Sequence, residues 1–130
     1  MNYSDKIYKT RKWYISHELL FFQPQSAKGY RGKRKFVVWE NLILIKARSP
    51  EEALRKAIKH GRLNEEKVKI DGEEGRCTFK GLRDLVLIYD DLVDGAELEW
   101  HDLRKDTSEL AIMVKPKRQM QAFNLRPTKP

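Results

Sequence analysis

The chain has 130 residues, of which 40% are hydrophobic, and its 27 lysines and arginines exceed its 19 acidic residues to give a formal net charge of +8. This length fits one domain with a single modest core, and the positive charge favours acidic or polyanionic partners. A lone cysteine, Cys77, excludes an internal disulfide and a cysteine-rich zinc site. No apolar run is long enough for a membrane span or a secretory signal, so we predict a cytoplasmic protein with no membrane partner.

An arm and a strand are predicted at the start of the chain. Residues 1–12 are polar and predict a flexible N-terminal arm. "KWYISHELLFF", residues 12–22, alternates in the manner of a β-strand. One face carries Trp13, Ile15, His17, Leu19 and Phe21, and the other carries Tyr14, Leu20 and Phe22. We expect the second set to lie on an open face of the sheet and to line a partner-binding surface.

A second strand follows a loop that glycines and a proline interrupt. "FVVWENLILIKA", residues 36–47, has apolar side chains on both of its faces. This pattern is typical of a strand that is covered on both sides, so we predict a central position in the sheet.

The clearest local signal is the helix predicted over residues 50–60. Ser49 is a favourable N-cap, Pro50 suits the first helical position, and Glu52 completes a capping box. Gly61 is expected to end the helix in a left-handed conformation. The apolar stripe that should pack on the sheet consists of Ala53, Leu54, Ala57 and Ile58.

The remainder of the chain predicts a β-meander. Short strands are expected at "KVKI", "RCTFKGL", "LVLIY" and "AELEW", with a bulge or bend at Gly81, and "ELAIMV" is a candidate last strand. The predicted fold is therefore α+β, a small and mostly antiparallel sheet in the order β-β-α-β-β-β with one helix packed on one face. We place this domain at residues 13–114 and a basic extended tail at residues 115–130.

The positive charge is concentrated in three segments rather than spread over the domain. The loop at residues 27–36 and the tail from residue 115 together carry +10, the N-terminal arm adds +3, and the rest of the chain is therefore −5. Mobile cations can follow a phosphate backbone, and aromatic side chains in such a loop can stack on unpaired bases. The predicted nucleic-acid contacts are Lys28, Tyr30, Arg31, Lys33, Arg34, Lys35, Lys115, Lys117 and Arg118.

No motif in the sequence specifies a reaction. His60 suits the predicted helix end, His17 lies on an apolar strand face, and His101 precedes Asp102, a pairing that can orient an imidazole. No spacing matches a zinc signature, a nucleophile elbow or a phosphate-binding loop. We therefore predict no catalytic residues, no metal and no cofactor.

Three segments of the chain resemble a family of small bacterial domains of unknown function. They are "KWYISHELLFF", "ENLILIKARSPEEALRKAIKHG" and "CTFKGLRDLVLIYDDLVDGAELEW", which together span roughly residues 13–100. The family opens with a Trp-Tyr strand, continues with an "IKAxSxEEAxxKA" strand and helix, and has a late "DGxE" turn. The resemblance implies the α+β fold and a bacterial cytosolic setting, and it implies no activity.

Two functions from different classes remain open at this point. The first is a non-enzymatic accessory module that contacts nucleic acid or a nucleoprotein, DNA or RNA, through the basic loop and tail. The alternative is a protein–protein interaction module, such as an antitoxin, an immunity protein, a defence-complex subunit or a homo-oligomer, in which the acidic late segment matters more. A small-molecule hydrolase would need a pocket around His101 and Asp102.

Overall fold

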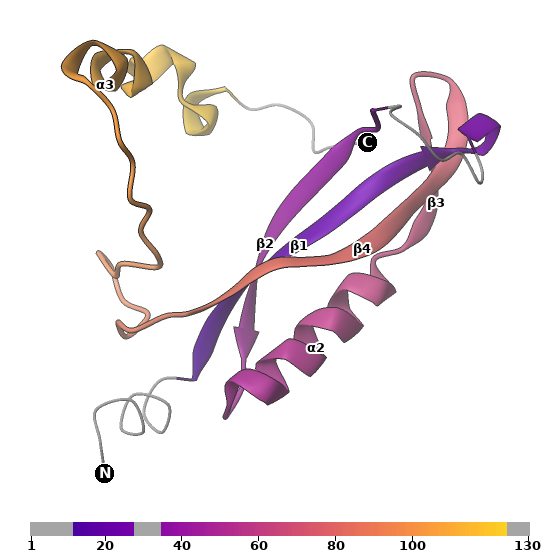
Figure 1. Ribbon diagram of the computed structural model, residues 1–130, viewed down its shortest axis with the longest axis horizontal. Coiled ribbons are helices and arrows are strands. Elements are labelled where there is room, and N and C mark those ends of the chain that lie inside the picture. The colour runs from indigo at the N-terminus through magenta and orange to yellow at the C-terminus, as the bar shows by residue number, and fades with distance from the viewer. Residues whose placement is uncertain (1–11, 28–34, 125–130) are drawn as a thin grey trace. The chain divides into compact units, whose positions relative to one another are not determined.

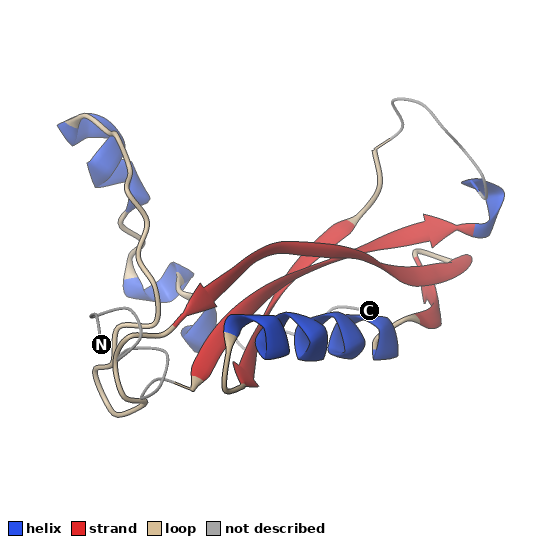
Figure 2. Ribbon diagram, turned by 60° about the horizontal axis from the view of Figure 1, so that its bottom comes forward, coloured by secondary structure: helices blue, strands red, loops and turns tan. Residues whose placement is uncertain are grey.

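The computed structural model describes residues 12–27 and 35–124, and the chain divides into two compact units, Met1–Glu99 and Trp100–Pro130. In the first unit, four antiparallel strands form one sheet in the order β2-β1-β4-β3 (Figure 1). Figure 2 shows helix α2 running along one face of this sheet. The elements of this unit are β1 (Trp13–Pro24), η1 (Gln25–Ala27), β2 (Val38–Lys46), α2 (Pro50–Leu63), β3 (Glu66–Ile70) and β4 (Glu73–Leu87).

The described part of the second unit contains a short helix and two 3-10 turns. These are α3 (Thr107–Met113), η2 (Lys117–Gln119) and η3 (Gln121–Phe123). None of the helices that the structure describes is long and apolar enough to cross a membrane.

The predicted fold class is confirmed, although the sheet has fewer strands than expected. "RCTFKGL" and "LVLIY" belong to one continuous strand, β4. Gly81 lies inside this strand at φ +145°, where its pairing with β1 is irregular, so the expected bend is a local bulge that does not end the strand. The long β4 pairs with both β1 and β3, which makes β1 and β4 the two central strands.

The position predicted for the second strand is wrong. β2 lies at an edge of the sheet and pairs with β1 on one side only, without a register shift over nine residue pairs. Its even-numbered residues are all exposed, whereas Ile45 is buried. Apolar character on both faces therefore did not mean burial on both faces, because no helix covers the side of the sheet opposite to α2 in the described part of the first unit.

The faces of β1 are also the reverse of the prediction. Tyr14, Leu20 and Phe22 are buried, and Tyr14 joins Ile45, Ala47 and two helix alanines in the main core cluster. They consequently lie on the covered face and cannot line an open partner-binding surface. Ile15 and His17 on the opposite face are nearly as inaccessible. Both faces of β1 are apolar, so alternation alone could not tell which face receives the helix.

Helix α2 begins as predicted and ends three residues later than expected. The Ser49 hydroxyl accepts a hydrogen bond from the Glu52 backbone N–H at 3.1 Å, and Pro50 occupies the first turn. The helix packs through its smallest residues, Ala53, Ala57 and Gly61, while Leu54 from the predicted stripe is 44% exposed. Small side chains allow the helix axis to approach the sheet closely.

Gly61 is not the helix cap but an interior contact. A Cβ atom at this position would overlap the aromatic ring of Phe79 on β4, so the missing side chain makes room for that ring. The helix therefore continues past Gly61 to Leu63, with Asn64 as its C-cap.

The last two predicted strands do not form. "AELEW" has no regular secondary structure, and "ELAIMV" falls mainly within helix α3. The Asp106 carboxylate accepts a hydrogen bond from the Glu109 backbone N–H at 2.8 Å and so caps the start of α3. This local cap favours a helix here over the β-propensity of the isoleucine and valine in the segment.

Candidate functional site

The structure describes only some of the nucleic-acid contacts predicted from the sequence. Lys28, Tyr30, Arg31, Lys33 and Arg34 lie outside the described residues. Lys35 in the first unit and three cations in the second unit are exposed, and none of them forms an ion pair with a described carboxylate. The three cations of the second unit are Lys115, Lys117 and Arg118. Lys117 instead places its ammonium group 5.1 Å from the ring centre of Phe123.

A basic groove lies at the end of the sheet where the β1–β2 loop begins. The groove has a volume of about 630 Å³ and lies between the end of β1 and the β3–β4 hairpin. Its cations are Lys67 and Lys69 of β3 and Arg76 of β4, and its single acid is Glu74. Lys67 is directly opposite Arg76 in the sheet, and Arg76 is directly opposite Gln23 of β1. Three exposed cations against one acid make the groove electropositive.

The three groove cations are available for a ligand. None of them forms an ion pair with a residue that the structure describes. The alternation in "KVKI" could have revealed this feature, because it places both lysines on one face of a short strand. Arg76 could not have been added from the sequence, since only the hairpin register brings it beside Lys67.

The described ends of the basic loop are both attached to the sheet. On the β1 side, the Ser26 hydroxyl donates a hydrogen bond to the Glu73 carboxylate at the start of β4. On the β2 side, the ring of Phe36 packs edge-to-face on Phe21, with the ring centres 5.9 Å apart. The cationic loop therefore leaves the sheet and returns to it at defined positions, and its first end adjoins the groove.

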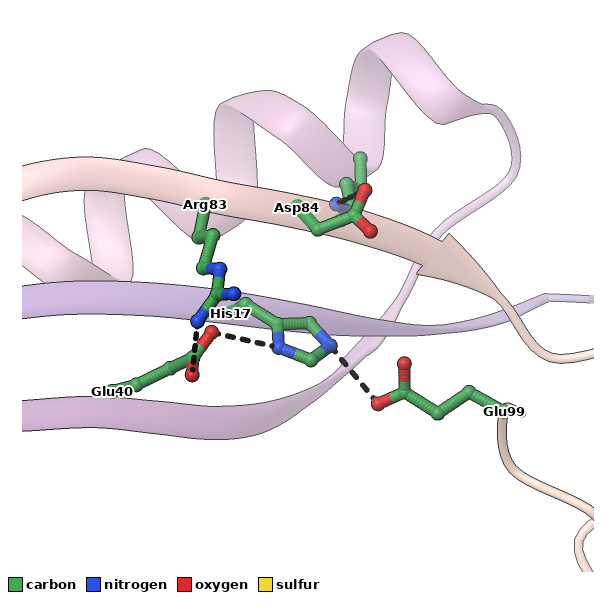
Figure 3. Close-up of polar contacts among 6 residues, drawn as sticks. His17, Glu40, Arg83, Asp84 and Glu99 are labelled. Atoms are coloured by element: carbon green, nitrogen blue, oxygen red, sulfur yellow. Dashed lines mark hydrogen bonds and ion pairs between the residues drawn. The ribbon is translucent and has the colours of Figure 1, made fainter. Parts of the chain in front are cut away.

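A polar cluster occupies the face of the sheet opposite to α2 (Figure 3). His17 is 7% exposed, and its Nδ1 lies 3.1 Å from Glu40 Oε2 on β2. Its Nε2 lies 3.0 Å from Glu99 Oε1, close enough for an ion pair although not in hydrogen-bond geometry. Arg83 of β4 donates to the other oxygen of Glu40 at 3.2 Å. A carboxylate therefore lies beside each ring nitrogen of His17, one from β2 and one from the segment after β4.

A second histidine–carboxylate pair lies on the helix side of the sheet. Glu18 of β1 is fully buried, and its Oε2 lies 2.8 Å from His60 Nδ1 on α2. The Ser16 hydroxyl donates to the same oxygen at 3.3 Å. Serine contacts the carboxylate and not the imidazole, so the order of groups differs from a nucleophile–base–acid triad. The pair attaches α2 to the centre of the sheet, a role that the position of His60 at the helix end did not reveal.

Cys77 and Asp90 have structural roles in and after β4. Cys77 is buried on β4, as expected for a small hydrophobic side chain. Asp90 accepts a hydrogen bond from the Glu97 backbone N–H at 2.9 Å and so stabilises the turn after β4. Among residues 12–27 and 35–124, no group of three or more histidine, cysteine or acidic side chains is arranged to hold a metal ion.

Comparisons with known proteins identify a family but no characterised relative. No curated protein and no solved structure matches the chain. One family model matches residues 13–100, the span over which the sequence resembles a family of domains of unknown function. This match ends next to the boundary between the two compact units at Glu99. The chain belongs to the family described as "Domain of unknown function (DUF4288)".

Proposed function

We propose that this domain is a non-enzymatic module that binds nucleic acid, alone or within a nucleoprotein, through its β1–β2 loop, the adjacent groove and the C-terminal cations. The observation that carries the proposal is the groove formed by Lys67, Lys69 and Arg76, which adjoins the first anchored end of the cationic loop. The groove cations lie on β3 and β4 and not in the loop, so they support phosphate binding independently of the loop.

The physical basis of this binding is neutralisation of phosphates. Each lysine or arginine that contacts a phosphate releases condensed counterions, so affinity falls steeply as salt concentration rises. Cations that already have carboxylate partners would lose those partners on binding and contribute less. The groove cations have none among the described residues, so phosphate contact carries no such cost.

The experiment measures binding of fluorescently labelled single-stranded and duplex DNA and RNA over a salt series. The test variant replaces Lys67, Lys69 and Arg76 with alanine. We expect weaker binding and a decrease of about two to three in the slope of log affinity against log salt concentration. The matched control replaces three exposed cations of α2, Arg55, Lys59 and Arg62, with alanine, which changes the net charge equally.

Two results would contradict the proposal. The first is a flat salt response of the unmodified protein. The second is an equal loss of binding in the groove variant and the α2 control, since this would mean that only net charge matters. A further variant with Arg31, Lys33, Arg34 and Lys35 changed to alanine measures the contribution of the loop.

The alternative function is recognition of another protein, and a different observation favours it. Helix α3 has no buried residue, and Leu110, Ile112 and Met113 are all exposed on it. Exposed apolar side chains on one short helix are typical of a surface that a partner covers. Purification of the complete chain from its native host distinguishes the two functions: a stoichiometric protein partner without nucleic acid supports this one.

A further inference from the structure

The two edges of the sheet differ in the features that prevent strands from pairing with other molecules. β3 has five residues and carries two exposed lysines, Lys67 and Lys69, which discourage further pairing. β2 has nine residues, contains no proline and pairs with β1 without a bulge. No described strand lies beyond it. A long, regular edge of this kind is a template for another strand.

Two hydrogen bonds define which backbone groups of β2 point away from the sheet. The Phe22 N–H donates to the Val37 carbonyl at 2.9 Å, and the Ala47 N–H donates to the Lys12 carbonyl at 2.8 Å. Odd-numbered residues of this segment therefore bond towards β1, and the even-numbered residues 38–46 direct their N–H and C=O groups outward. The same even-numbered residues present their side chains on the face opposite to α2, where Val38, Leu42 and Leu44 are 57%, 56% and 49% exposed.

We infer that a second copy of this chain pairs with β2, strand to strand and antiparallel, about a two-fold axis at Ile43. This register places Leu42 of one copy opposite Leu44 of the other, and it does so twice because of the symmetry. In the same way, Glu40 of each copy lies opposite Lys46 of its partner. The strand is thus complementary to itself in both apolar character and charge.

Neighbouring registers pair the charged side chains and the outward backbone groups of β2 less well. A two-fold axis at Leu42 would place Glu40 opposite Leu44 and Lys46 opposite Val38, so both charges would face apolar side chains. A shift of one residue would set outward backbone groups against groups already bonded to β1. The favoured register therefore joins the two four-stranded sheets edge to edge, with both α2 helices on the same face.

Glu40 can accept the additional cation. Its two oxygens contact His17 at 3.1 Å and Arg83 at 3.2 Å, one partner for each oxygen, and a carboxylate oxygen has a second lone pair for a lysine. Lys46 now lies 5.5 Å from the ring centre of Trp13 and forms no ion pair with a described residue, so its charge is available.

Analytical ultracentrifugation of the complete chain over a range of concentrations tests this pairing. We expect a reversible dimer in the unmodified protein. Lys46→Glu places a carboxylate opposite a carboxylate in both charged pairs of the dimer, and Glu40→Lys places a lysine opposite a lysine. Each variant alone should therefore raise the dimer dissociation constant about ten- to thirty-fold. Mixing the two variants should restore dimers, because every charged pair is then attractive. Lys59→Glu on α2 is the control and should dimerise normally.

Covalent trapping tests the register itself. In the inferred dimer, Ile43 lies opposite its own symmetry mate at a distance that a disulfide can bridge. Ile43→Cys should cross-link under oxidation, whereas Leu42→Cys and the unmodified protein, with its buried Cys77, should not. A monomer at all concentrations, no recovery on mixing, or faster cross-linking of Leu42→Cys would each overturn the inference. None of these outcomes depends on nucleic-acid binding.

Discussion

The imidazole of His60 lies 2.8 Å from a carboxylate oxygen of Glu18, a side chain that solvent does not reach. The two residues are 42 positions apart, one on helix α2 and one on the central strand β1. A buried carboxylate is costly unless it is paired and hydrogen-bonded, and His60 together with Ser16 supplies those bonds. The contact therefore couples the position of the helix to the sheet.

Removal of His60 should destabilise the domain, because it leaves the Glu18 carboxylate buried with Ser16 as its remaining described partner. We expect His60→Ala to lower the free energy of unfolding by about 2 kcal/mol, a value reduced for the partial exposure of the imidazole. Urea denaturation measures the change. Lys59→Ala, at the neighbouring exposed position, is the control and should stay within about 0.5 kcal/mol of the unmodified protein. Equal stability of the two variants would contradict a structural role for the pair.

Substitution of Gly61 should also destabilise the domain, despite the better helix propensity of alanine. Alanine gains about 1 kcal/mol over glycine in a helix interior, but its Cβ would overlap the ring of Phe79. We expect a net loss of about 1–3 kcal/mol from the resulting displacement of the helix. Thermal unfolding of Gly61→Ala measures this loss, with Arg55→Ala on the exposed side of α2 as the comparison. A higher melting temperature would show that the helix and sheet can separate without cost.

Loss of Glu99 should release the segment after β4 without unfolding the sheet. Its carboxylate lies 3.0 Å from His17 Nε2, whereas the other ring nitrogen contacts Glu40. We expect Glu99→Ala to accelerate amide hydrogen exchange in residues 96–99 and to change the global stability by no more than about 1 kcal/mol. Glu97→Ala, which removes an exposed carboxylate from the same segment, is the control and should leave exchange unchanged. A global loss of protection would mean that the contact supports the entire fold.

Helix α3 should lose its N-cap in acid. The backbone hydrogen bond from Glu109 holds the pKa of the Asp106 carboxyl below its ordinary value of 3.8. Because the folded pKa is the lower one, the cap stabilises α3 above the ordinary value and is lost as the pH falls through the depressed pKa. NMR chemical shifts of the α3 amides should therefore move towards coil values as the pH falls through the depressed pKa of Asp106. In Asp106→Ala the acid transition should be absent, whereas Asp102→Ala should retain it.

Several elements could be predicted from short stretches of sequence because the interactions that form them are local. The start of α2 depends on Ser49, Pro50 and Glu52, which lie within one turn of one another. The strand pattern of residues 12–22 likewise needs only the alternation of neighbouring side chains. The family resemblance over residues 13–100 was carried by the same segments and is confirmed.

The tertiary structure alone decided which surfaces are covered and which charges meet. Tyr14 and Ile15 are both apolar, so their sequence could not tell which face would receive α2. The structure places α2 on the Tyr14 face, where Tyr14 joins two helix alanines in the core and Gly61 leaves room for the Phe79 ring. Local sequence determined the elements of this protein. Contacts between distant residues, which depend on strand order and register, determined its edges, its groove and its histidine–carboxylate pairs.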